Sequence, residues 1–278
     1  MESRRVAIVT GAGNGLGAAF AQTIARDGTA VIVNNRRHAD RLFSADPVVD
    51  AIRADGGEAI SDDHAVDSPD GPAALIATAA DHFGRLDALV LNAGISGPAV
   101  KIGQGDIALA EVMAINFFAN AAIVEAALPL LQQSPAGRIV FVSSTGGLYG
   151  VRGRAAYAAS KGAVNGYALS LADELRRTDI RVNVIAPYAA TNMTAQPGRP
   201  PDPRLSPDGA AGILALLASP DCDRTGEIWV AGGGAIRAAR AMESRAAPFA
   251  PTAVEELGAM PDARFYPGGE AAFADFYR

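Results

Sequence analysis

Short apolar runs alternate with longer segments of helical pattern along most of the chain. Each run holds five or six residues and is bounded by Gly, Asp, Asn or Pro, which is typical of buried strands. The segments between the runs are amphipathic or rich in alanine, which predicts helices. The runs are Val6–Thr10, Ala30–Asn34, Glu58–Asp62, Ala88–Asn92, Arg138–Ser143, Arg181–Ala186 and Glu227–Ala231.

Regular alternation of strands and helices predicts right-handed β–α–β crossovers, which bury a parallel sheet between two helical layers. We therefore expect an α/β fold: a Rossmann-type, doubly wound parallel sheet of seven strands with helices on both faces. One unbroken alternation predicts one domain over residues 1–237. Five prolines between Ala195 and Gly209 predict an irregular lid, at about residues 188–207.

Residues 238–278 follow the last predicted strand and carry prolines and scattered aromatic side chains. We expect this C-terminal extension to pack against the body of the protein or against a neighbouring subunit.

Composition excludes several classes of partner. The 278 residues are 49% hydrophobic and 19% charged, with a formal net charge of −6, which suits neither nucleic acid nor anionic membranes. Cys222 is the only cysteine, so we expect no internal disulfide and a reducing, cytoplasmic location. The first residues show no signal-peptide pattern, and Asn, Glu and Pro interrupt the apolar segment Val112–Gln132, which predicts a buried or interface helix. The three histidines lack the spacing of metal ligands, so no metal site is predicted.

Glycines gather where the first predicted strand meets the first predicted helix. The stretch Thr10–Gly17 reads TGAGNGLG, and Gly11, Gly15 and Gly17 fall in the turn. Glycine permits positive φ and lets a ligand approach the backbone, while the helix start offers N–H groups to an anion. The turn therefore predicts a pyrophosphate site, although a tight turn without a ligand stays open on this motif alone.

Tyr157 and Lys161 lie four residues apart in a predicted helix, so they share one face. A neighbouring ammonium favours phenolate, so we expect the pKa of Tyr157 to fall below its ordinary value of about 10. Tyr157 would then donate and accept protons near neutral pH. Alone, a Tyr–Lys pair at this spacing is also typical of ordinary surfaces.

Further features stand in a fixed order around this pair. Ser144 follows the fifth predicted strand, thirteen positions before Tyr157. The motif Asn92–Gly94 (Asn-Ala-Gly) ends the fourth strand, and Asn116 interrupts an apolar helix. With the threonine-led Gly-x-x-x-Gly-x-Gly turn, this pattern resembles the short-chain dehydrogenase/reductase family over most of the chain, from Val6 to Arg237.

The resemblance implies an oxidoreductase that passes a hydride between a nicotinamide and the carbonyl carbon of a small-molecule substrate. It implies that Tyr157 exchanges a proton with the carbonyl oxygen, and that Ser144 hydrogen-bonds this oxygen and stabilises its charge. Lys161 would hold the ribose hydroxyls of the nicotinamide nucleotide. Asn116 would hold a helix kink and a water that connects Lys161 to solvent.

The same resemblance implies a set of dinucleotide-binding residues from the glycine turn, the strand ends and the catalytic helix. They are Gly11, Asn14, Gly15, Leu16, Asn35, Arg36, Arg37, Ala65, Val66, Asn92, Ala93, Gly94, Tyr157, Lys161, Pro187, Ala189 and Thr191. The expected border of the substrate pocket includes Gly146, Tyr149 and Tyr188.

The residues after the second strand bear on the coenzyme. An NAD enzyme would carry a carboxylate near Asn35 to accept a hydrogen bond from the ribose 2′-hydroxyl. Here Asn35 is followed by Arg36 and Arg37, and guanidinium groups suit a phosphate dianion. This predicts NADP(H) in preference to NAD(H), with a solvated turn as the plain alternative.

The leading hypothesis is therefore an NADPH-dependent reductase of a ketone to a secondary alcohol. An NAD-linked 3-hydroxyacyl-CoA dehydrogenase is the alternative, because SSTGGLYG and APYAATNMT resemble the (3R)-hydroxyacyl-CoA dehydrogenase unit of multifunctional β-oxidation enzymes. A non-catalytic dinucleotide sensor of the same fold is a third. The resemblance also implies a homodimer or homotetramer, paired through the apolar helices Glu111–Leu131 and Tyr157–Arg176.

Overall fold

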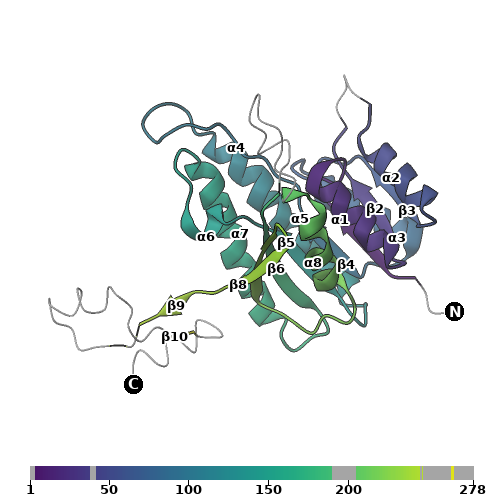
Figure 1. Ribbon diagram of the computed structural model, residues 1–278. Helices are drawn as coiled ribbons and strands as arrows, with labels where there is room; N and C mark the ends of the chain where they lie inside the picture. Colours follow the sequence, from purple (N-terminus) through teal and green to yellow (C-terminus); the bar gives the residue numbers. More distant parts are fainter. Residues whose placement is uncertain (1–3, 38–41, 190–204, 245, 247–263, 266–278) are drawn as a thin grey trace. The chain divides into compact units, whose positions relative to one another are not determined.

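The computed structural model describes residues 4–37, 42–189, 205–244, 246 and 264–265 (Figure 1). The chain divides into two units, Met1–Arg237 and Ala238–Arg278. The first unit holds the sheet and the helices that surround the predicted site. In the second, β9 (Met242–Glu243) and β10 (Arg264–Phe265) form a short antiparallel pair.

The described residues form one large sheet of eight strands, in the order β3-β2-β1-β4-β5-β6-β7-β8. Every neighbouring pair from β3 to β7 is parallel, and each of the seven predicted runs is a strand whose ends lie within one residue of expectation. From β1 the chain first adds β2 and β3 on one side, and it then crosses over to place β4 on the other side of β1. Open α/β sheets bind ligands at such a switch point. The strands are β1 (Val6–Val9), β2 (Ala30–Asn34), β3 (Ala59–Asp62), β4 (Ala88–Leu91), β5 (Arg138–Val142), β6 (Arg181–Pro187), β7 (Glu227–Gly232) and β8 (Ala235–Ala239).

The sheet has one strand more than the seven predicted. The extra strand, β8, lies beside β7, and its residues are exposed or half-buried. A strand without a buried face shows no alternation of apolar and polar residues, and its alanines have low strand propensity. The sequence pattern therefore did not reveal it.

Helices cover both faces of the sheet, as predicted (Figure 1). Side chains from α1, α2 and α8 join one buried cluster with the strands, while α3, α5 and α7 pack on the other face. The helices are α1 (Gly15–Arg26), α2 (Ala45–Ala54), α3 (Gly71–Phe83), α4 (Leu109–Met113), α5 (Ala119–Leu131), α6 (Gly146–Tyr149), α7 (Ala155–Glu174) and α8 (Asp208–Ala218).

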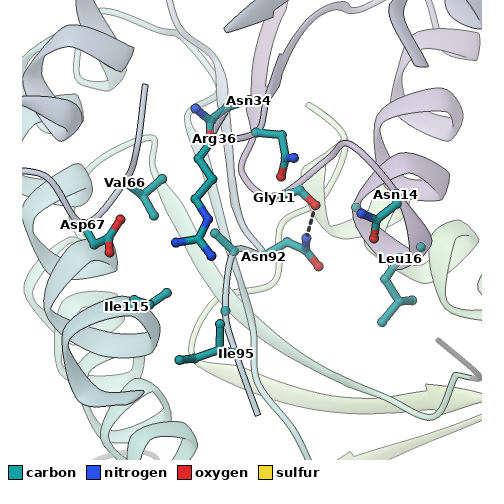
Figure 2. A pocket seen from close by; sticks show the side chains of 15 residues that line it. Gly11, Asn14, Leu16, Asn34, Arg36, Val66, Asp67, Asn92, Ile95 and Ile115 are labelled. Carbon is teal, nitrogen blue, oxygen red and sulfur yellow. Dashed lines mark hydrogen bonds between the residues drawn. The ribbon is translucent and has the colours of Figure 1, made fainter. Parts of the chain in front are cut away.

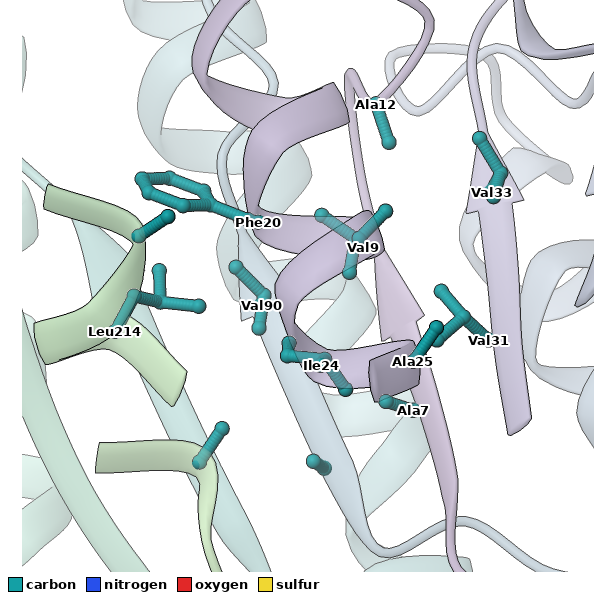
Figure 3. Packing of buried hydrophobic residues seen from close by; sticks show 14 of the residues in the cluster. Ala7, Val9, Ala12, Phe20, Ile24, Ala25, Val31, Val33, Val90 and Leu214 are labelled. Carbon is teal, nitrogen blue, oxygen red and sulfur yellow. The ribbon is translucent and has the colours of Figure 1, made fainter. Parts of the chain in front are cut away.

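The core anchors α1, the helix that follows the glycine turn (Figure 3). Phe20 and Ile24 of α1 are buried against Val9 and Val90 of the sheet and Leu214 of α8. Burying such a side chain contributes about 1.5–3 kcal/mol. This packing fixes the start of α1 above the switch point of the sheet.

A π-helical turn, η1 (Ala114–Phe118), joins α4 to α5 and contains Asn116. The resulting segment Leu109–Leu131 is long and apolar enough to cross a membrane by length and composition alone, and 44% of its most apolar stretch is buried within the fold. Here it packs against α3 and α7. The kink implied at Asn116 is thus a widened helical turn, a feature often found at functional sites.

Candidate active site

A cleft of about 240 Å³ lies at the switch point, beside the carboxyl ends of the strands (Figure 2). Its walls come from the glycine turn, the end of β2, the loops after β3 and β4, and one side chain of η1. The lining residues are Gly11, Asn14, Gly15, Leu16, Gly17, Asn34, Asn35, Arg36, Val66, Asp67, Asn92, Ala93, Gly94, Ile95 and Ile115.

Ten of these residues belong to the predicted dinucleotide set. The five others are immediate sequence neighbours of predicted residues: Gly17, Asn34, Asp67, Ile95 and Ile115. Gly17 was already part of the predicted glycine turn, and adjacency was the only signal for the other four. Six predicted residues with described positions are not part of the lining: Arg37, Ala65, Tyr157, Lys161, Pro187 and Ala189. Thr191 and most of the predicted lid lie outside the described residues.

The glycine turn packs tightly against the end of β4. Gly11 and Gly15 have φ values of +63° and +55°, a region that favours glycine. A Cβ on Gly11 would lie 2.8 Å from Cα of Ala93, and a Cβ on Gly17 would collide with the carbonyl oxygen of Gly11. No side chain caps the N-terminus of α1, so its first N–H groups are available to an anion in the cleft.

Asn92 braces this turn from the neighbouring strand. Its Nδ2 donates to the carbonyl oxygens of Thr10 at 2.9 Å and Gly11 at 3.1 Å. In return, the Thr10 hydroxyl accepts hydrogen bonds of 3.0 Å from the N–H groups of Asn92 and Ala93. The Asn-Ala-Gly motif therefore sets the distance between the two strand ends that flank the cleft.

The three residues after β2 have different surroundings. Asn35 lines the cleft and donates from Nδ2 to the Ser44 hydroxyl at 2.6 Å. Arg37 lies outside the lining, pairs with Asp63 at 2.9 Å and stacks over the Phe43 ring at 4.3 Å. Arg36 extends into the cleft and has no hydrogen bond or ion pair with another described residue (Figure 2). Of the two arginines, only Arg36 is thus placed to meet a ligand in the cleft.

The buried carboxylate of Asp62, at the end of β3, anchors the loop that follows this strand. This group accepts hydrogen bonds from Asn34 Nδ2 at 2.7 Å and Thr78 Oγ1 at 2.7 Å, and it contacts the His64 ring at 2.9 Å. Val66 reaches the cleft, whereas Ala65 shapes the loop by accepting hydrogen bonds from Ser68 through its carbonyl oxygen. No group of three metal-binding side chains is present among the described residues.

Ser144 and Tyr157 meet where β5 faces the first turn of α7. The Ser144 hydroxyl accepts a 3.0 Å hydrogen bond from the N–H of Gly146, and a Cβ on Gly146 would lie 3.4 Å from Ser144 Oγ and 3.6 Å from Tyr157 Cε1. Burial raises the pKa of Tyr157 above its ordinary value of 10, and the Ser144 hydrogen bond and the charge of Arg154 offset only part of this. Tyr157 therefore keeps its proton at neutral pH.

Lys161 lies one turn after Tyr157, with 4% of its surface exposed. Its Nζ donates to the carbonyl oxygen of Val142 at 2.7 Å and lies 5.9 Å from the centroid of the Tyr157 ring. Burial lowers the pKa of Lys161 from 10.5 to about 8. The expectation of a lowered Tyr157 pKa is wrong here, because the phenol is itself buried and the ammonium is directed at the backbone of β5.

Asn116 joins the cleft to the catalytic helix. Its Oδ1 accepts a hydrogen bond from Ile95 N–H at 2.8 Å, and its Nδ2 donates to Ile95 O at 2.9 Å and to Ser160 Oγ at 3.0 Å. A Cβ on Gly94 would lie 2.9 Å from Asn116 Oδ1 and 3.6 Å from Lys161 Nζ. Gly94 therefore lines the cleft and lies next to Asn116 and Lys161.

The three residues expected at the substrate pocket differ in position. A Cβ on Gly146 would lie 3.6 Å from Cε1 of Tyr157, so Gly146 borders the catalytic phenol. Tyr149 is 78% exposed, at the end of α6. Tyr188 follows β6, is 41% exposed and donates its N–H to Ala231.

Comparison with known proteins connects this geometry to a family. The family model for short chain dehydrogenases matches residues 5–200. A short-chain type dehydrogenase/reductase of Mycobacterium tuberculosis is 34% identical over 263 residues, which cover 92% of each chain. A 3-oxoacyl-[acyl-carrier-protein] reductase of Synechocystis is 34% identical over 77% of this chain and 89% of its own. Peroxisomal multifunctional enzyme type 2 of Drosophila melanogaster is 39% identical over 80% of this chain. The matched region covers 38% of the length of that enzyme.

A solved structure agrees. The crystal structure of a short chain dehydrogenase from Mycobacterium avium is similar with a TM-score of 0.79 and 33% identity, covering 94% of this chain and 96% of that one. The match to the family model and the similarity to this crystal structure both include the glycine turn, the cleft and the catalytic helix. The chain therefore belongs to the short-chain dehydrogenase/reductase family, whose members are oxidoreductases that act on CH–OH and C=O groups.

Proposed function

We propose that this protein is an NADPH-dependent reductase that converts a ketone to a secondary alcohol. The observation that carries the proposal is the Tyr157 phenol beside the Ser144 hydroxyl: one point, the Cβ that Gly146 lacks, would lie 3.4 Å from Ser144 Oγ and 3.6 Å from Tyr157 Cε1, and burial raises the pKa of the phenol. Reduction of a carbonyl group needs such a proton donor at the carbonyl oxygen.

The cleft fits a dinucleotide. Gly11, Gly15 and Gly17 line it, side chains at Gly11 and Gly17 would collide with the backbone that shapes the turn, and the uncapped start of α1 offers N–H donors to a pyrophosphate. NADPH, when bound, supplies the hydride. The chain's own residues supply the binding surface and the proton.

Arg36 supports NADP(H) over NAD(H). Its guanidinium is exposed in the cleft without an ionic partner among the described residues, and the neighbouring lining residue is Asn35 rather than a carboxylate. A 2′-phosphate would find a charge-assisted partner there. A carboxylate at position 35 would repel it.

The catalytic side chains divide the work on the substrate oxygen. Tyr157 donates its proton to this oxygen, and the Ser144 hydroxyl, oriented by Gly146, donates a hydrogen bond as negative charge develops. Lys161 is mostly protonated at neutral pH, because its pKa is about 8. Its positive charge stabilises the phenolate that remains on Tyr157 after proton transfer.

A second candidate is an NAD-linked 3-hydroxyacyl-CoA dehydrogenase. Its support is the 39% identity to a peroxisomal multifunctional enzyme and the 36% identity to a peroxisomal hydratase-dehydrogenase-epimerase of Neurospora crassa. The chain spans only 38% and 20% of these two proteins. The 3-oxoacyl reductase relative favours the reductive direction on a similar carbonyl compound.

The test is oxidation of NADPH and of NADH by the purified protein, with a panel of ketones and 3-oxoacyl thioesters. We expect turnover with NADPH to be faster, and Tyr157→Phe to abolish it. Tyr167→Phe is the matched control, because Tyr167 lies on the same helix with its ring packed against Phe117 and Phe141. Unchanged turnover in Tyr157→Phe would contradict the role of the phenol.

We further propose that the protein forms a homodimer or homotetramer through η1, α5 and α7. Phe118 is 60% exposed and Leu169 is 41% exposed, which is unfavourable for large apolar side chains on a monomer. Light scattering should give a multiple of the chain mass, and Phe118→Glu should lower that mass.

A further inference from the structure

Arg154 is the residue at which the loop after α6 becomes the catalytic helix. Its N–H donates to the carbonyl oxygen of Val151, and its own carbonyl oxygen accepts the hydrogen bond of Ala158. Tyr157 follows three residues later, in the first turn of α7. A change at Arg154 therefore acts directly on the start of the helix that carries the phenol.

The guanidinium of Arg154 leaves the helix and contacts the loop after β4. Its Nη1 donates to the carbonyl oxygen of Gly97 at 2.8 Å and to that of Ser96 at 3.5 Å. Both contacts come from one nitrogen of the guanidinium, so a single side chain joins two successive carbonyl groups of this loop to the start of α7.

The four residues Gly94–Gly97, here called the bridging strip, run from the cleft to this contact. The first half lines the cleft and is held by Asn116 through both backbone groups of Ile95. At the other end, Gly97 has φ of +63°, and a Cβ there would lie 2.7 Å from Cγ2 of Val112. Asn116 thus holds the cleft half of the strip, and Arg154 holds the other half, Ser96 and Gly97.

We infer that Arg154 is a positioning residue of the oxidoreductase site: it ties the bridging strip to the first turn of α7, the turn that carries Tyr157. This inference rests on the proposed role of Tyr157 as proton donor. Arg154 was not among the catalytic residues predicted from the sequence, because no sequence motif indicates that it contacts the bridging strip.

The positive charge of Arg154 also acts electrostatically on the Tyr157 phenol. Two cations face Tyr157, namely Arg154 from the start of α7 and Lys161 from the next turn, and Ser144 faces it from the end of β5. No carboxylate acts on the phenol among the described residues, and none pairs with Arg154. The guanidinium therefore lowers the pKa of Tyr157 against the effect of burial.

The two contributions are separable by substitution. Arg154→Lys keeps the charge but loses the guanidinium nitrogen that reaches the two carbonyl groups, whereas Arg154→Met loses both the charge and the contacts. Arg152→Met is the matched control, because Arg152 is exposed in the same loop and has no hydrogen bond or ion pair with a described residue.

Two measurements distinguish the effect of the Arg154 charge from the effect of its hydrogen bonds. The first is a titration of the tyrosinate absorbance, taken as the difference between each protein and the same protein carrying Tyr157→Phe, which needs neither coenzyme nor substrate. The second is the pH profile of kcat/KM, with whichever coenzyme and ketone the unmodified protein turns over. Reduction needs protonated Tyr157, so activity falls as pH rises through its pKa.

We expect Arg154→Met to raise the pKa of Tyr157, to move the alkaline fall in activity to higher pH and to lower kcat/KM about tenfold. Arg154→Lys should leave the titration unchanged and still lower kcat/KM. Arg152→Met should change neither.

An unchanged titration in Arg154→Met together with kcat/KM within twofold of the unmodified protein would overturn the inference, as would equal shifts in Arg152→Met. Should Arg154→Met not fold, undiminished kcat/KM in Arg154→Lys would overturn it. Turnover with NADH alone would contradict the proposed coenzyme while leaving both readouts of Arg154 intact.

Discussion

The Lys161 ammonium donates a 2.7 Å hydrogen bond to the carbonyl oxygen of Val142, at the end of β5. This carbonyl is its one hydrogen-bond acceptor among the described residues, although the side chain is almost fully buried. A charged group loses its hydration in such a place, and its pKa falls to about 8 in consequence. The buried charge of Lys161 beside Tyr157 therefore lowers the stability of the fold at neutral pH.

Lys161→Met should therefore stabilise the fold at neutral pH. The folded-state pKa of about 8 lies below the ordinary 10.5, so the unfolded chain binds more protons between these values and stability rises with pH across that window. Below it, the buried charge costs up to roughly 3 kcal/mol. After loss of the Val142 hydrogen bond, Lys161→Met should gain about 1–2 kcal/mol at pH 7, and the gain should shrink toward pH 10. Urea unfolding at both pH values measures this.

Lys101→Met is the control, because Lys101 is exposed and is the only other lysine of the chain. Its free energy of unfolding should match that of the unmodified protein at both pH values. A Lys161→Met protein that is less stable at pH 7, by an amount that does not change with pH, would be incompatible with this account.

Two glycine-to-alanine substitutions should have opposite effects. A Cβ on Gly17 would collide with the carbonyl oxygen of Gly11 and lie 2.6 Å from Asn92 Nδ2, so Gly17→Ala should destabilise by about 1–3 kcal/mol and weaken coenzyme binding. Gly212 is exposed in α8 with nothing within 4 Å of its added Cβ. Gly212→Ala should stabilise by about 0.5–1 kcal/mol. Thermal unfolding and a fluorescence titration with NADPH give both results, and equal losses in the two variants would contradict the packing described for the turn.

The strands were predictable because their apolar runs are short, buried and bounded by turn residues. The parallel sheet follows from alternation with helices. The strands that were not predicted are β8, an exposed edge strand that leaves no pattern of burial, and the short pair β9 and β10. Similarly, the π-helical turn at Asn116 has no local propensity signal, and its presence was implied by the family resemblance alone.

The chemistry of the site was less predictable than its residues. Spacing placed Tyr157 and Lys161 on one face of α7, but the direction of the Tyr157 pKa depends on burial, which spacing does not reveal. Arg36 and Arg37 are equivalent in sequence, yet Asp63 and Phe43 engage only Arg37. The ion pair with Asp63 depends on a residue 26 positions away along the chain, which a reading of neighbouring residues does not reveal.

Arg36 and Arg37 should therefore respond differently to alanine substitution. Arg36→Ala should raise the KM for NADPH at least about tenfold and leave that for NADH nearly unchanged, because it removes the cation available to a 2′-phosphate. Arg37→Ala should affect the two coenzymes alike and lower stability by less than about 1 kcal/mol, as for other exposed pairs. Steady-state kinetics with both coenzymes decides. A larger NADPH-selective effect in Arg37→Ala would reverse the assignment.

Asn116 and Asn120 allow a last comparison within one helical segment. Asn116→Ala leaves the N–H and carbonyl oxygen of Ile95 without their partners, so it should destabilise by about 2–4 kcal/mol and weaken NADPH binding through the cleft wall. Asn120 is equally buried but makes one hydrogen bond, to the carbonyl oxygen of Asn116, and its Oδ1 has no partner. Asn120→Ala should cost about 1 kcal/mol or less, because it also removes an unsatisfied oxygen.

Urea unfolding and coenzyme titration of both variants separate a brace of the cleft from an ordinary buried amide. If Asn116 holds the bridging strip in place, the loss of coenzyme affinity should appear in Asn116→Ala alone, even at temperatures where both proteins are fully folded. Equal losses of affinity in the two variants would mean that the π-helical turn as a whole, and not the contact between Asn116 and Ile95, shapes this wall of the cleft.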